Sequence, residues 1–214
     1  MENLRSEILK FRTWQKDFYS GKPEYELNGE WECAYNGWDK IYTAFSHVLS
    51  AYLPQEAEHK LLSEMVYIIA RDNESEWLIE ETVPYDGWFA LLCRCSLKAN
   101  EPDARWQFAS RLAECGCNQE IKKLILRFVE DKNEYVSRRA LLVLPNILPK
   151  QVEHYVLLFW DRDCFGTVLL EYQRMALLDA LSTSSSPLLD TYLEKARQSG
   201  QPYLMHLAEK IKCQ

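Results

Sequence analysis

Hydrophobic and polar positions follow one another at helical spacing through the second half of the chain. Residues 134–148 read EYVSRRALLVLPNIL: an aromatic residue, a basic pair, and then an apolar stripe that begins at Ala140. Weaker copies of this phrase occupy residues 105–113, 171–181 and 202–211. Aligned on Ala109, Ala140, Ala176 and Ala208, the copies are 31, 36 and 32 residues apart. A period in the thirties is typical of stacked helical pairs, so the pattern predicts helical repeats.

Amphipathic segments of a second kind lie between these copies. Residues 119–130 carry apolar side chains at positions i, i+3, i+4, i+7 and i+8 from Ile121, and residues 151–160 repeat this spacing from Val152. Such a face must be buried against another helix, so each segment is expected to pair with the copy that follows it. The outer helices predicted in this way cover residues 88–98, 119–130, 151–160 and 187–198.

The first part of the chain predicts further helices, interrupted by two acidic stretches. Apolar residues spaced three to four apart predict helices over residues 3–19, 39–52 and 56–70. The first acidic stretch, residues 22–36, is expected to form an ordered loop or a short hairpin. The second, residues 71–86, is expected to contain a short helix around Trp77.

Pro84 and Gly87 break the chain after the second acidic stretch. We therefore expect two parts: an N-terminal helical cap with acidic loops, residues 1–86, and four degenerate repeats, residues 87–214. The repeats and the cap are expected to form one continuous solenoid, because a terminal cap is needed to cover the exposed end of stacked helical pairs.

The repeats resemble the HEAT-repeat family of α-solenoids over roughly residues 88–214. Asp131 is followed seven residues later by Arg138, and then by a second Arg, an Ala and leucines. The resemblance implies an all-α, right-handed α-α superhelix in which this Asp and Arg link neighbouring repeats. Gln107 and His206 stand where Arg138 and Arg174 stand in the other copies, so the ladder is incomplete. A solenoid fold does not fix a function.

One branch of HEAT-like proteins offers an enzymatic alternative. The chain length and the helical repeats also resemble the alkylpurine DNA glycosylases, which use a concave basic surface with tryptophans and an Asp near the damaged base. Neither Trp88 nor Trp106 is followed by an acid on the same helix face. The net charge of −7 also opposes DNA binding. A third alternative, a structural scaffold or a phycobilin-lyase-like helper, has no support from individual residues.

The distribution of charge is more informative than its total. Residues 1–100 contain 10 Lys+Arg and 17 Asp+Glu, whereas residues 101–214 contain 15 of each. A nucleic-acid or anionic-membrane surface needs clustered cations, so the acidic first half argues against both and favours a basic protein partner. Neither a secretory segment nor an apolar run of membrane-spanning length is recognisable, and the seven cysteines are an odd number. A cytoplasmic protein with reduced thiols fits these features.

No group of residues in the sequence points to catalysis, a metal or a cofactor. The sequence contains two Cys-x-Cys pairs, at Cys93 and Cys115. Cys93 and Cys95 cannot both bind one zinc ion, because residues two apart on a helix diverge by about 200°, and buried free thiols are the expected state. The four histidines are scattered, and the seven glycines cannot supply a phosphate-binding loop as well as turns. We therefore expect no catalytic residue, no metal site and no cofactor.

Two tryptophans lie inside the acidic stretches, where an aromatic anchor surrounded by carboxylates would suit a basic protein. The alternative is ordinary loop packing. The candidate partner-binding residues in these stretches are Glu30, Trp31, Glu32, Glu76, Trp77, Glu80 and Tyr85.

The basic residues of the repeats are a second candidate surface. Arg138 and Arg174, with Arg105, Arg111 and Arg139, would line the concave face and bind a carboxylate-rich or phosphorylated partner. The alternative is that they form ion pairs between repeats. Taken together, the sequence predicts a non-enzymatic protein-binding module. Its concrete form would be an immunity or inhibitor protein that neutralises a basic toxin such as a nuclease.

Overall fold

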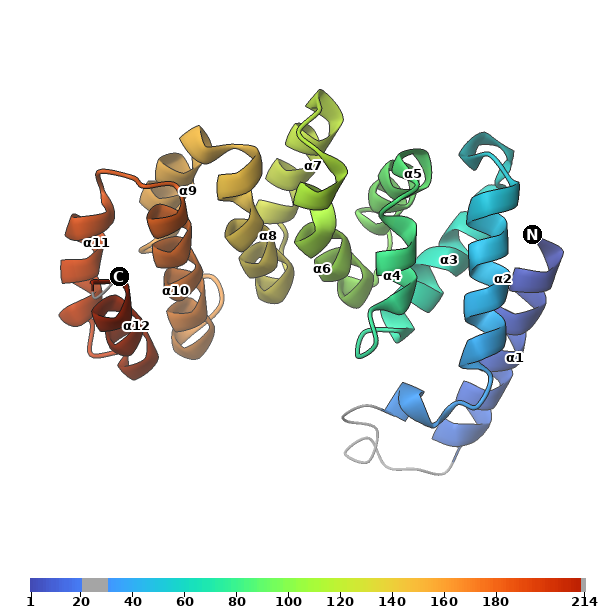
Figure 1. Cartoon of the computed structure of the whole chain (residues 1–214). Helices are drawn as coiled ribbons and strands as arrows, with labels where there is room; N and C mark the ends of the chain where they lie inside the picture. Colours follow the sequence, from blue (N-terminus) through green and yellow to red (C-terminus); the bar gives the residue numbers. More distant parts are fainter. Residues whose placement is uncertain (21–30, 213–214) are drawn as a thin grey trace. The chain divides into compact units, whose positions relative to one another are not determined.

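A computed structural model describes residues 1–20 and 31–212 of the chain. Within these ranges the protein consists of α-helices and short 3-10 helices, without any strand, which confirms the all-α prediction. The chain divides into two compact units, Met1–Phe108 and Ala109–Gln214. Each is described by itself below (Figure 1).

The described residues of the first unit form five α-helices and the start of a sixth. They are α1 (Glu2–Tyr19), α2 (Trp38–Ala51), α3 (His59–Arg71), α4 (Trp77–Thr82), α5 (Asp86–Ser96) and α6 (Pro102–Arg111), with 3-10 turns at Trp31–Ala34 and Pro54–Glu56. Helix α1 packs against α2 and α3, α4 packs against α2, and α5 packs against α3 and α4. The core between them is apolar, because α2 and α3 bury the residues that the spacing predicted, from Ile41 to Leu49 and from Leu61 to Ile69.

The second unit contains three consecutive helical pairs. They are α7 (Gln119–Val129) with α8 (Glu134–Ile147), α9 (Val152–Phe159) with α10 (Thr167–Thr183), and α11 (Leu189–Arg197) with α12 (Pro202–Lys212), with 3-10 turns at Leu112–Cys115 and Pro149–Gln151. The second helices of the pairs contact one another in series, α8 with α10 and α10 with α12. Ala140 and Ala176, which mark the repeated phrase, are both buried in this series of contacts.

The helices of the second unit are held together by apolar faces and by buried polar groups. All ten apolar positions predicted on residues 119–130 and 151–160 are buried. Gln173 on α10 is fully buried; its Nε2 donates to the Glu134 carbonyl at 3.2 Å, and its Oε1 accepts from Arg162 at 2.6 Å. Glu171 Oε1 accepts the N–H groups of Tyr203 and Leu204 at 2.8 and 3.1 Å, so a carboxylate of α10 caps the start of α12.

The first acidic stretch and the predicted domain boundary were both assigned from the sequence. Residues 31–34 of the first acidic stretch form a 3-10 turn, while residues 22–30 lie outside the described ranges. The boundary predicted at residues 86–87 separates a cap from repeats and stays a prediction; the two compact units meet between Phe108 and Ala109, within α6. No described helix has the length and apolar character needed to cross a bilayer.

Candidate binding site in the N-terminal unit

The first unit contains a cavity of about 200 Å3 at the end of α3. Three segments line it. Glu32 and Cys33 come from the 3-10 turn, Trp38 and Tyr42 come from α2, and residues 71–75 follow from the end of α3. Both acidic stretches of the sequence therefore reach the same cavity.

Asp72 organises the wall that follows α3. Its Oδ1 accepts the Tyr42 hydroxyl at 2.8 Å, and its Oδ2 accepts the N–H of Leu78 in the first turn of α4 at 2.7 Å. Its carbonyl accepts the N–H of Glu76 at 2.8 Å, and Glu76 has a left-handed backbone with φ of 53°. One aspartate thus ties α2, the loop and the start of α4 together, and Glu76 stores backbone strain beside the cavity.

Glu32 is the unusual group of the cavity. Glu32 is only 4% exposed. Trp38 Nε1 donates a hydrogen bond of 2.9 Å to the Glu32 backbone carbonyl and so fixes the 3-10 turn. No other residue within the described ranges forms a hydrogen bond or an ion pair with the Glu32 carboxylate. A buried carboxylate without a partner is costly in water-poor surroundings.

Burial dominates the protonation of both carboxyl groups. It raises the pKa of Glu32 to about 7; Arg71 opposes this shift, while Asp103 and Glu74 reinforce it. Burial also raises the pKa of Asp72 to about 6, although its hydrogen bonds from Leu78 and Tyr42 favour the ionised form. Near neutral pH, the cavity therefore holds Asp72 mostly ionised and Glu32 close to its titration midpoint.

An aromatic column forms one side of the site. The rings of Trp38 and Tyr42 stack with centroids 5.6 Å apart and planes at 25°, and Tyr42 continues the column to Trp77 at 4.5 Å. Trp38 is held from the other side by Phe11 at 5.2 Å and Tyr35 at 6.2 Å. Because α1, α2 and α4 all contribute rings, the position of the wall is set by the core of the unit.

Among the described residues that line the cavity, the cation is Arg71, and part of its guanidinium group is already paired. Arg71 forms an ion pair with Glu101 through Nη2 and stacks over the Tyr67 ring at 5.1 Å. Asn73, next to Asp72, has a buried Oδ1 without a hydrogen-bond donor in the described ranges. Among the described residues, the cavity wall thus has two acceptor groups without a donor, the Glu32 carboxylate and Asn73 Oδ1, and one buried donor without an acceptor, Arg71 Nε. The two acceptors suit a ligand that brings N–H donors.

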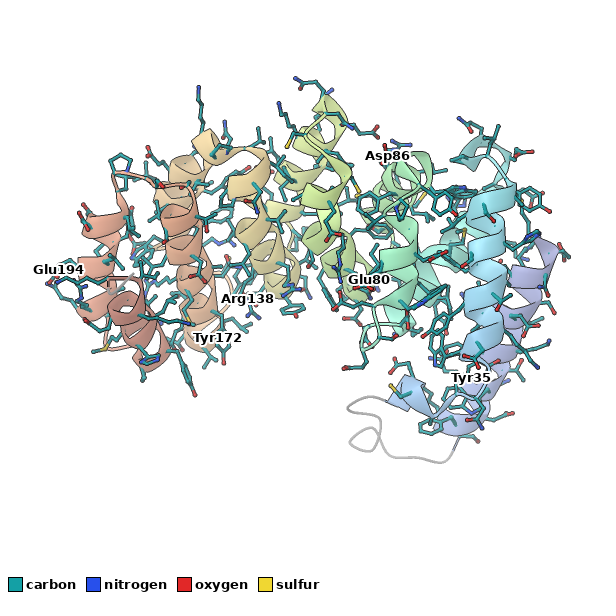
Figure 2. All side chains as sticks on the ribbon, viewed as in Figure 1. Tyr35, Glu80, Asp86, Arg138, Tyr172 and Glu194 are labelled. Atoms are coloured by element: carbon teal, nitrogen blue, oxygen red, sulfur yellow. The ribbon has the colours of Figure 1, made fainter. Side chains whose placement is uncertain are left out.

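The candidate residues of the acidic stretches fall into three groups. Glu32 lines the cavity, and Trp77 lies behind Tyr42 in the aromatic column. Glu76 precedes α4, Glu80 is exposed on α4 (Figure 2), and Tyr85 precedes α5; none of these three lines the cavity. Glu30 and the side chain of Trp31 lie outside the described part of the chain.

Sequence reasoning missed Tyr42, Asp72 and Asn73. A signal for Tyr42 exists, because Trp38 and Tyr42 are one helical turn apart and so share a face. A signal for Asp72 also exists, since it directly follows the predicted third helix and can hydrogen-bond nearby N–H groups. That these residues meet Glu32 depends on tertiary contacts, which no local pattern shows.

Arg138 and Arg174 belong to the second unit and have separate neighbours. Arg138 Nε lies 3.0 Å from Glu134 Oε1, and its guanidinium lies 4.9 Å from the ring centroids of both Tyr135 and Tyr172. Figure 2 shows Arg138 and Tyr172 on adjacent helices. Arg174 donates to the Trp160 carbonyl and to Gln201 Oε1, both at 2.8 Å, and lies 3.6 Å from Asp161.

The other arginines of the predicted stripe also have partners within their own units. Arg105 donates to the Ala99 carbonyl, Arg111 lies 3.3 Å from Glu114, and Arg139 donates to Ser110 Oγ. Asp131, the expected partner of Arg138, accepts the N–H of Asn133 at 2.8 Å. These contacts favour a structural role for the arginines.

The residues weighed for other chemistry are unremarkable in their surroundings. Cys93 is buried, Cys95 and Cys115 are half-buried and Cys117 is exposed, all as free thiols. The described residues contain no cluster of three or more His, Cys, Asp or Glu suited to a metal ion. Trp88 and Trp106 are both buried, so neither ring lies on the surface.

Comparison of the chain with protein-family models, with curated proteins and with solved structures gives no match. The resemblance to HEAT repeats therefore stays a prediction from the sequence.

Proposed function

We propose that this chain is a non-enzymatic, HEAT-like protein-binding module that captures a basic protein through its first unit. The concrete form we favour is an immunity or inhibitor protein that masks a basic toxin such as a nuclease. The observation that carries the proposal is the Glu32 carboxylate, which is buried beside an aromatic wall and has no ion-pair partner among the described residues.

The charge of the two units supports this assignment. Residues 1–108 contain 11 Lys+Arg and 19 Asp+Glu, whereas residues 109–214 contain 14 and 13. The whole negative excess of the chain thus belongs to the unit that contains the cavity. Such a field raises the association rate of a basic partner and disfavours acidic ones.

The second unit supports the proposal through what its arginines already do. Arg174 satisfies the carbonyl of Trp160 at the end of α9, and Arg138 is paired with the buried Glu134. A surface that binds phosphates needs cations that are available for it. These arginines are already paired with groups of the second unit, Arg138 within α8 and Arg174 with the end of α9 and Gln201, which weighs against the glycosylase alternative.

Affinity capture of the full chain followed by mass spectrometry tests the proposal. We expect one basic protein to be retained, and we expect Glu32→Lys and the double variant Glu30→Lys/Glu32→Lys to lose it. Glu58→Lys is the matched control, because it changes the net charge equally from an exposed position at the far end of α3, about 18 Å along the helix.

Two outcomes would overturn the proposal. Equal loss of the partner in Glu58→Lys and Glu32→Lys would assign capture to net charge alone. A strong affinity for duplex DNA that falls steeply with salt, abolished by Arg138→Ala or Arg174→Ala in folded protein, would favour the glycosylase alternative. Circular dichroism of each variant separates loss of binding from loss of fold.

A further inference from the structure

We infer that the cavity beside Glu32 receives a single arginine side chain of the basic partner, with the guanidinium group against the Glu32 carboxylate and the Trp38–Tyr42 wall. This inference rests on the proposed function and names the chemical group that the site recognises. Three features of the cavity support it: acceptor groups without hydrogen-bond donors among the described residues, the aromatic wall of Trp38 and Tyr42, and the volume.

The unmet acceptors require a ligand with several donors. Glu32 is buried, and neither its carboxylate nor Asn73 Oδ1 receives a hydrogen bond from another described residue. A guanidinium group carries five N–H donors in one plane and can serve two acceptors at once. A water molecule would supply only two donors and no charge, so it would leave the carboxylate uncompensated.

The aromatic wall favours a guanidinium over an ammonium group. An arginine head group is planar and weakly hydrated, so it loses less hydration on packing against aromatic side chains than the compact, strongly hydrated head group of lysine. The protein already uses this contact elsewhere, with Arg12 3.7 Å from the centroid of Tyr67. The charge of Arg71 on the wall is balanced by Glu101, so it does not cancel the attraction of Glu32.

The size of the cavity limits the ligand to one side chain. Sites for drug-sized molecules occupy about 300–1,000 Å3. The cavity here measures about 200 Å3, which suits the end of one long side chain entering from a protein surface. The rest of the partner would then meet the acidic surface of the unit.

Binding is expected to depend on pH because the ligand needs Glu32 to be ionised. The charged and titratable groups that face Glu32 are Arg71, Asp103, Glu74 and Tyr19. Asp72, Tyr42 and Cys33 share the cavity. Since burial places the pKa of Glu32 at about 7, a bound cation must displace a proton below that pH. Affinity should therefore rise as the pH increases through about 7 and then level off.

The direct test uses the full chain and N-acetylarginine amide as the probe, followed by the fluorescence of the tryptophans at constant ionic strength. N-acetylcitrulline amide, which is neutral and nearly the same shape, is the ligand control. At about pH 8 we expect the arginine probe to bind in the millimolar range and the citrulline probe at least about tenfold more weakly. N-acetyllysine amide should bind more weakly than the arginine probe.

Variants assign this binding to the cavity. Glu32→Gln keeps the size of the side chain and should weaken the arginine probe about tenfold at pH 8 while removing the pH dependence. Asn73→Ala, a second variant that leaves Glu32 in place, should weaken it about threefold. Glu58→Gln should leave binding unchanged. Equal binding of arginine and citrulline probes, or full binding by Glu32→Gln, would overturn the inference.

The outcome is separable from that of the proposed function. Saturable arginine binding in a protein that captures no basic partner would overturn the proposed function and keep the cavity assignment. Capture of a basic protein that persists in both Glu32→Gln and Asn73→Ala, with no binding of the arginine probe, would overturn the cavity assignment and keep the proposed function.

Discussion

The Tyr42 hydroxyl donates a hydrogen bond of 2.8 Å to Asp72 Oδ1 and so joins the middle of α2 to the end of α3. Tyr42→Phe keeps the aromatic column and removes this bond, leaving a buried carboxylate with one donor fewer. We expect the free energy of unfolding to fall by about 1–2 kcal/mol. Urea denaturation measures the change. Tyr85→Phe is the control, because the Tyr85 hydroxyl makes no hydrogen bond in the described ranges.

The stability of the protein should decrease as the pH rises from about 5 to about 8. In the folded state the pKa of Glu32 lies at about 7, above its ordinary value of 4.5, so the folded state holds the proton more tightly. The resulting stabilisation is complete below about pH 4.5 and is lost as the pH rises through about 7. Asp72 acts in the same direction between 3.8 and about 6.

The contribution of Glu32 can be isolated with Glu32→Gln, which does not titrate. Between about pH 5 and pH 8, the free energy of unfolding of the wild type should fall by roughly 2 kcal/mol more than that of the variant. Urea denaturation at both pH values provides the comparison. Parallel pH dependences in the two proteins would show that Glu32 titrates normally.

We expect the Glu76→Gly variant of the protein to be more stable than the Glu76→Ala variant. Its φ of 53° lies in the left-handed region, which costs a residue with a Cβ atom and costs glycine little. Relative to Glu76→Ala, Glu76→Gly should gain about 1 kcal/mol of stability. Thermal denaturation of the two variants measures the difference; a glycine variant less stable than the alanine variant contradicts the assigned backbone.

Replacement of Gln173 should strongly destabilise the second unit. Gln173→Ala removes an acceptor from Arg162 and a donor from the carbonyl of Glu134, all in buried surroundings. We expect a loss of about 2–4 kcal/mol. A double-mutant cycle with Arg162→Ala should show strong coupling, because each single change already breaks the shared bond. Additive effects would indicate that the two side chains act independently.

The helices could be predicted because their signals are local. Residues 119–130 place five apolar side chains on one face, and all five are buried in α7. The same holds for α9, where the spacing from Val152 predicted the buried face through Trp160. Each of these signals lies within one or two helical turns, where the geometry of the backbone alone relates the residues.

The cavity could be predicted only in part, because it joins three segments that are far apart in sequence. The acidic stretches drew attention to Glu32 and Trp77, and both lie at or beside it. Glu80 and Tyr85 share the composition of the stretch but lie elsewhere on their elements. Whether Arg138 binds a partner or a neighbouring helix was left open by the sequence. Its ion pair with Glu134 lies within α8, one turn away, whereas its contact with the Tyr172 ring depends on the packing of α8 against α10.

Glu171 of α10 supplies the N-terminal cap of α12, so the capping residue comes from another helix. Pro202 has no N–H to donate, and the next two N–H groups of α12 end on the Glu171 carboxylate rather than on a residue that precedes the helix. Residues 202–212 therefore depend on α10 for the cap of their first turn. Removal of residues 202–212 would therefore leave the Glu171 carboxylate of α10 without these two hydrogen-bond donors.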